Sequence, residues 1–156
     1  MTFDDFLMSV DPQYQTFALS INEYLLQNDC KIKLTQAKNG YVVSYPHGKK
    51  KRVVMNFVFR KSGLVVRIYG DHVGQYLDLL ETLPENMKKS IEKAPACKRF
   101  EDPPKCSQNC VGYVFNMDEK QHQKCRYNAF MFEVNDENIP FIRTLVEKEL
   151  EARNAA

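Results

Sequence analysis

Four of the five cysteines of this chain lie within one short stretch, at Cys97, Cys106, Cys110 and Cys125. Three residues separate Cys106 from Cys110, a spacing that structural zinc sites use within a close pair of ligands. Zinc prefers four tetrahedral ligands, and the two outer cysteines complete a Cys₄ set. His122 is a substitute for the fourth ligand. The sequence therefore predicts a structural zinc site at these residues.

The same thiols fit two other interpretations. Cys106 and Cys110 can act as a redox sensor or serve a thiol-dependent enzyme, although the C-x-x-C at a helix start that is typical of dithiol switches is absent. Alternatively, the cysteines are free thiols buried as small hydrophobic residues, as we expect for Cys30. Zinc ribbons usually show two close pairs and this chain shows one, so the alternatives stay open.

A second set of candidate residues is basic and lies on two neighbouring predicted strands. Alternation places Arg60, Arg67 and Tyr69 on the face opposite the apolar side chains. With Arg126 they form a face suited to an anionic ligand, because guanidinium groups bind carboxylates and phosphates in a bidentate manner. Any solvated sheet also carries arginine on its polar face, which is the alternative. The apolar face of the first strand is expected to hold Val53, Met55, Phe57 and Phe59.

The basic run Lys49–Arg52 precedes these strands. It fits either a solvated hairpin edge that discourages strand pairing or a contact with nucleic acid. The formal net charge is only +2, so the whole molecule attracts nucleic acid or an acidic membrane weakly. The low net charge therefore counts against a nucleic-acid partner, although a local basic patch would suffice to bind one.

The chain also lacks the usual signals for a membrane or secreted protein. No apolar run approaches the length of a membrane span, and the N-terminus carries acids where a secretory signal has a basic flank. We therefore expect a cytoplasmic protein whose thiols stay reduced.

Hydrophobic periodicity and turn residues indicate the elements that position these side chains. Asp11 and Pro12 open a helix that ends near Asp29. The pair Asn39-Gly40 is a strong hairpin signal within a four-strand antiparallel meander over about residues 31–70. Two short helices follow, then a cysteine-rich segment at about residues 94–126. This segment is expected to be irregular as far as about Cys110, to form a strand over VGYVF at residues 111–115, and to continue as a polar stretch over residues 116–124. A strand is expected to begin near Cys125, and a final helix covers about residues 138–153.

These elements predict a single α+β domain over residues 1–156. Its antiparallel meander sheet is expected to pack N-terminal, central and C-terminal helices on one face, with the cysteine-rich segment added. A chain of 156 residues, 44% of them hydrophobic, buries a sufficient core without disulfides.

The pair Asp71-His72 is the remaining candidate for acid–base chemistry. Asp71 is explained as the cap of a short helix, and no P-loop, G-x-S-x-G or H-E-x-x-H motif is present. The sequence therefore favours a binding protein over an enzyme.

The strings NFVFRKSGLVVRIYGDH, APACKRFEDPPKCSQNC and KCRYNAFMF resemble those of a family of small uncharacterised bacterial proteins that share this layout over nearly the whole chain. The resemblance implies that the arginines and the four clustered cysteines belong to one recurring pattern. It brings no assigned activity or ligand. Taken together, the sequence favours a binding or interaction domain with a structural zinc ion, whose partner is a small anionic ligand or a protein.

Overall fold

The computed structural model describes residues 2–97 and 112–156 and contains a five-stranded antiparallel sheet. The strand order is β1-β2-β3-β4-β7, so the first four strands form the predicted meander and β7 pairs with β4. The bounds of these strands are β1 Lys33–Ala37, β2 Gly40–His47, β3 Arg52–Arg60, β4 Gly63–Ile68 and β7 Met131–Glu133.

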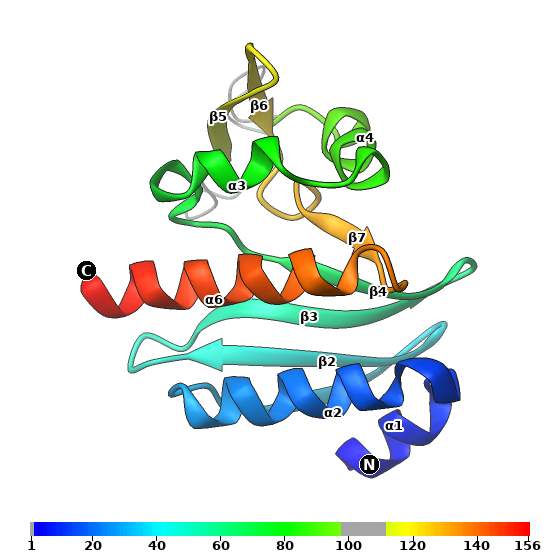
Figure 1. Ribbon diagram of the computed structural model, residues 1–156. Helices are drawn as coiled ribbons and strands as arrows, with labels where there is room; N and C mark the ends of the chain where they lie inside the picture. The colour runs from blue at the N-terminus through cyan, green and yellow to red at the C-terminus, as the bar shows by residue number, and fades with distance from the viewer. Residues whose placement is uncertain (1, 98–111) are drawn as a thin grey trace.

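Helices from the N-terminal, central and C-terminal parts of the chain accompany this sheet, which confirms the α+β class. Figure 1 shows α2 and α6 running along the strands, whereas α3, α4 and a small β5–β6 hairpin gather beyond β4 and β7. Their bounds are α1 Phe3–Ser9, α2 Pro12–Gln27, η1 Val73–Gln75, α3 Leu77–Glu81, α4 Glu85–Lys93, β5 Tyr113–Met117, β6 Lys120–Lys124 and α6 Ile139–Ala155.

Apolar stripes on the helices and one face of the sheet form the core. Phe57 of β3 is fully buried, and its ring lies 5.2 Å from that of Phe6 in α1 and 6.3 Å from that of Phe17 in α2, between centroids. Leu145 and Val146 of α6 belong to the same cluster. Packing of this kind fixes which face of the sheet is left for polar side chains.

One strand departs from the expected alternation. The pairing of β2 with β3 shifts register between Tyr45 and Pro46. As a result Val54 is fully buried in the core, whereas Val53 lines a cavity on the opposite face. The prediction that Val53 faces the core is wrong, because a bulge moves one residue to the other face.

The cysteine-rich segment is also more regular than expected. Residues 113–124 form the β5–β6 hairpin, and the chain after Cys125 is a turn rather than the start of a strand. Asp118 and Glu119 make the tight turn with φ values of 53° and 64°. Hairpin turns of this kind usually carry Asn-Gly or Asp-Gly, so this pair gave no turn signal.

Candidate functional site

A row of polar side chains crosses the sheet on the face opposite the core. The register aligns one residue from each strand in a single row: Lys33, Ser44, Asn56, Arg67 and Met131. The amide Nδ2 of Asn56 donates to Ser44 Oγ at 2.6 Å, and Arg67 Nη2 lies 3.9 Å from Met131 Sδ. Strand pairing therefore assembles this row from residues far apart in sequence.

Arg67 is the most unusual member of the row. It is 6% exposed, and its guanidinium lies 4.0 Å from the centre of the Tyr127 ring. Within the described residues it forms no ion pair with a carboxylate, and its Nε has no hydrogen-bond partner. Oδ1 of Asn56, its cross-strand neighbour, is likewise unpaired. Buried polar groups are normally paired, so two adjacent exceptions need an explanation.

The first four residues of the row line a groove that consists of two adjoining cavities. One has a volume of about 640 Å³ and the other about 320 Å³, and both are lined by Lys51 and Val53. Among the described residues, no aspartate or glutamate lines either cavity. The basic residues of this sheet groove, as we name the two cavities together, are Lys33, Lys50, Lys51, Arg52, Arg67 and Arg126.

Aromatic rings alternate with guanidinium groups along the groove. Arg126 lies 4.3 Å from the centre of the Tyr69 ring, and Arg67 lies 4.0 Å from that of Tyr127. The two tyrosine rings meet edge to face with centroids 6.1 Å apart. Burial raises the pKa of Tyr69, so its hydroxyl stays neutral at physiological pH. Tyr127 is 53% exposed, so the groove presents an aromatic ring to solvent.

At one end of the groove, Asp71 binds three arginines. Its carboxylate accepts from Arg126 at 2.8 and 3.1 Å, from Arg52 at 2.7 Å, and from Arg153 at 3.2 Å. The hydroxyl of Tyr113 donates at 2.9 Å. Burial opposes ionisation of Asp71, but the hydrogen bonds from Arg126 and Arg52 outweigh it and lower its pKa to about 2. Asp71 is therefore a paired structural anion, and the prediction that it caps a helix is wrong.

Glu149 extends this cluster into the interior. It is fully buried and accepts hydrogen bonds from the Tyr76 hydroxyl at 2.7 Å and from Arg153 Nε at 2.7 Å. The backbone N–H and ring Nδ1 of His72 each lie 2.9 Å from its carboxylate. The imidazole of His72 is thus held by Glu149 from α6, and not by its sequence neighbour Asp71.

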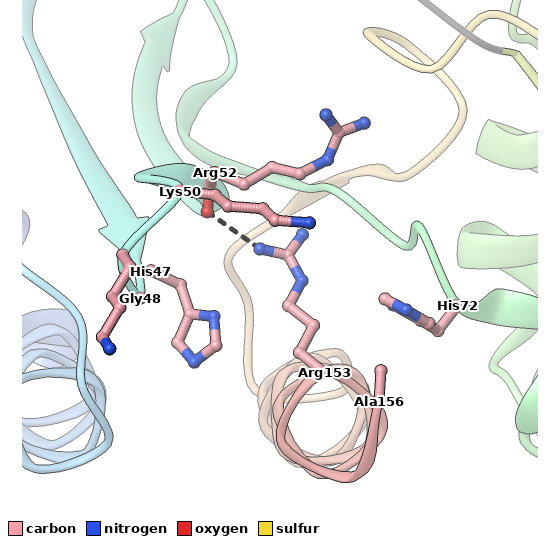
Figure 2. Close-up of a pocket in the computed structure, with 8 residues that line it drawn as sticks. His47, Gly48, Lys50, Arg52, His72, Arg153 and Ala156 are labelled. Carbon is pink, nitrogen blue, oxygen red and sulfur yellow. Dashed lines mark hydrogen bonds between the residues drawn. The ribbon is translucent and has the colours of Figure 1, made fainter.

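A third cavity of about 350 Å³ adjoins the groove through Lys50 and Arg52, which line both. Figure 2 shows His47 and His72 on opposite sides of Arg153, whose guanidinium donates to the backbone oxygen of Arg52 at 2.8 Å. Because Arg153 also bonds Val53, Tyr69, Asp71 and Glu149, it joins α6 to the sheet.

The remaining predicted anion-binding residue lies apart from these cavities. Arg60 is exposed at the end of β3, opposite Gly63, and is not among the residues that line the sheet groove. Sequence reasoning in turn missed Ser44, Asn56 and Tyr127. Hairpin register links the first two to Arg67, but no local pattern places Tyr127, because it lies in a turn.

Two predicted zinc ligands, Cys106 and Cys110, lie outside the described residues. Cys97 is buried under Gly112, where an added Cβ would overlap its Sγ. Its N–H donates to Gln123 O at 3.2 Å, and Cys125 N–H donates to Pro95 O at 3.0 Å, so both cysteines lie on adjoining antiparallel segments.

The substitute ligand His122 lies in β6. It is buried and stacks on Phe115 at 5.5 Å, and its Nε2 is 3.4 Å from Met117 O. Within the described residues, no group of three histidine, cysteine or acidic side chains is placed to hold a metal ion.

Comparisons with known proteins identify no relative. No protein-family model matches the chain, and no curated protein or solved structure matches it. In the part of the chain that the structure describes, none of the helices combines the length and the apolar character that crossing a lipid bilayer requires.

Proposed function

We propose that this protein binds an anionic ligand in the sheet groove. The observation that carries the proposal is Arg67, a buried arginine without a carboxylate partner among the described residues. Burying an unpaired charge is unfavourable, and an anion bound in the groove compensates for it. Lys33, Lys50 and Lys51 add further positive charge along the groove, whereas its other two arginines are paired with Asp71.

The residues of the groove favour binding over catalysis. Arginine stays protonated at all physiological pH values, so it orients and neutralises a ligand but does not transfer protons. Lys51 and the other lysines provide mobile positive charges at the rim. This agrees with the sequence-based preference for a binding protein.

Titration calorimetry with inorganic pyrophosphate at low salt tests the proposal. We expect binding that weakens as salt is added, because exposed charges are screened. The double variant Lys50→Gln/Lys51→Gln should weaken binding about tenfold or more. The double variant Lys38→Gln/Lys61→Gln, which removes the same charge from two exposed turns outside the groove, should not. Equal affinity of both variants, or no binding of pyrophosphate by the native protein, would contradict the proposal.

A structural zinc ion bound by Cys97, Cys106, Cys110 and Cys125 is a second proposal. It is supported by the hydrogen-bonded segments that carry Cys97 and Cys125, because such pairing brings two ligands of one site together. A cytoplasmic location belongs to the same proposal, since reduced thiolates are the zinc ligands.

Elemental analysis of the reduced protein should give about one zinc ion per chain, by the stoichiometry of a Cys₄ centre. The variant Cys125→Ser should lose the metal, and Cys30→Ala, which removes a core thiol, should retain it. Burial raises the pKa of Cys30 to about 11, which keeps this thiol protonated and unsuited to zinc. A folded protein without metal would contradict this proposal and leave the thiol-based alternatives.

A further inference from the structure

We propose that the anion bound by the sheet groove is a single-stranded nucleic acid. This inference rests on the proposed function and names its ligand class. Its backbone would follow the basic residues, and one of its bases would stack at Tyr127. Three independent features of the groove favour such a strand over a small anion.

The first feature is continuity. The two cavities of the sheet groove share Lys51 and Val53, and the third cavity joins them through Lys50 and Arg52. The basic β2–β3 turn thus connects three cavities into one path. A small anion occupies a single point on such a path, whereas a phosphate backbone places a charge at each repeat and uses its whole length.

The second feature is the aromatic ring within the basic surface. Tyr127 is 53% exposed although it lies in the groove, and the Arg67 guanidinium supports its ring at 4.0 Å. Grooves that bind single strands combine backbone-tracking cations with rings on which bases stack. In a duplex the faces of the bases are already stacked on each other, so the ring selects unpaired strands.

The third feature is the adjacent pair of unpaired atoms below Tyr127. Arg67 Nε needs an acceptor, and Asn56 Oδ1 needs a donor. A phosphate oxygen can accept from Arg67 and compensate its charge, as the proposed function requires, but it offers Asn56 no donor. A nucleotide supplies both groups, because its base carries amino or imino donors in addition to the phosphate acceptors of its backbone.

The full chain and a fluorescently labelled uridine octanucleotide test the inference by fluorescence anisotropy at low salt. We expect affinity to rise from the mononucleotide through the tetranucleotide to the octanucleotide, and a hairpin RNA duplex to compete poorly. The variant Tyr127→Ala should weaken octanucleotide binding about tenfold, the effect of losing one stacked base. Lys50→Gln/Lys51→Gln should reduce the salt dependence by about two phosphate contacts.

Tyr24→Ala is the matched control. Tyr24 also lies under an arginine, with Arg143 at 4.8 Å from its ring centre, but it is on α2 and not in the groove. Loss of binding in this variant would assign the effect to general destabilisation and overturn the role of Tyr127.

The outcomes separate the two proposals. If pyrophosphate binds but the octanucleotide binds no more tightly than the mononucleotide, the nucleic-acid inference fails and the anion-binding function stands. If neither ligand binds, both fail. Competition by phosphatidylserine vesicles at the same groove, with no gain in affinity along the oligonucleotide series, would reassign the groove to an acidic membrane and overturn the inference.

Discussion

Arg126 and Arg67 lie on the same face of the sheet, each against a tyrosine ring, yet their electrostatic surroundings are opposite. Arg126 forms a bidentate ion pair with Asp71, whereas Arg67 has no carboxylate partner in the described part of the chain. Arg126 completes a structural cluster, whereas Arg67 is the residue that the proposed anion would pair with. Under this proposal, pairing with a carboxylate distinguishes a stabilising arginine from a ligand-binding one, although their ring contacts are alike.

The two regions also differ in how their charges are fixed. Asp71 and Glu149 draw arginines from β3, the turn before β7 and α6, and thereby tie three parts of the fold together. The groove instead relies on neighbouring strands, whose register would hold Asn56 and Arg67 in place without any ion pair. The first region should thus dominate stability and the second should dominate binding.

The largest expected effect is the loss of the shared anion. Asp71→Asn should destabilise the protein by about 3 kcal/mol, because it leaves the largely buried guanidinium groups of Arg126 and Arg153 without their counter-charge. Urea denaturation measures this change. Asp78→Asn, at an exposed site in α3, is the control and should change the free energy of unfolding by less than about 0.5 kcal/mol. Similar free energies of unfolding for the two variants would contradict the view that the Asp71 cluster dominates stability.

The free energy of unfolding should fall in acid, because protonation of Asp71 removes its ion pairs. The pKa of Asp71 is about 2 in the folded protein, against an ordinary value of 3.8, so the stabilisation is present above pH 4 and is lost as the pH falls through about 2. With allowance for solvent screening, the loss is about 1 to 2 kcal/mol. It is measured by urea titrations between these pH values. The Asp71→Asn variant should lack this component, and an unchanged slope would contradict it.

Part of this fold could be predicted from the sequence. Turn residues and alternation predicted the meander and the face on which Arg67 and Tyr69 lie, because both signals are local. The strand predicted over residues 111–115 overlaps β5, but its pairing with β6 was missed because Asp118 and Glu119 adopt left-handed backbone conformations without glycine. Helix α1 was missed as well, although Thr2 and Asp5 form a capping box at its start.

The division between paired and unpaired arginines could not be predicted. Asp71 meets Arg126 and Arg153 only because β4, the turn before β7 and α6 converge, and no sequence spacing records that convergence. A local rule assigned Asp71 to a helix cap instead. Conversely, nothing in the sequence shows that Arg67 has no carboxylate partner among the described residues, since pairing depends on every neighbour in the fold.

The smallest expected effect has the opposite sign to the first and tests the comparison most directly. Arg67→Met should leave stability unchanged or raise it by about 1 kcal/mol, because an apolar side chain of similar length replaces a buried guanidinium with an unpaired Nε. The same change at Arg126 should destabilise the protein by about 2 kcal/mol, because it removes a hydrogen-bonded charge from Asp71.

Thermal and urea denaturation of the two variants give this difference, and pyrophosphate titration of Arg67→Met should show loss of binding in a protein at least as stable as the native one. Such a separation is expected only where a charge is retained for a ligand rather than for the fold. If Arg67→Met destabilises the protein as much as Arg126→Met, then Arg67 is a structural residue, and the proposal that it binds an anion in the groove is contradicted.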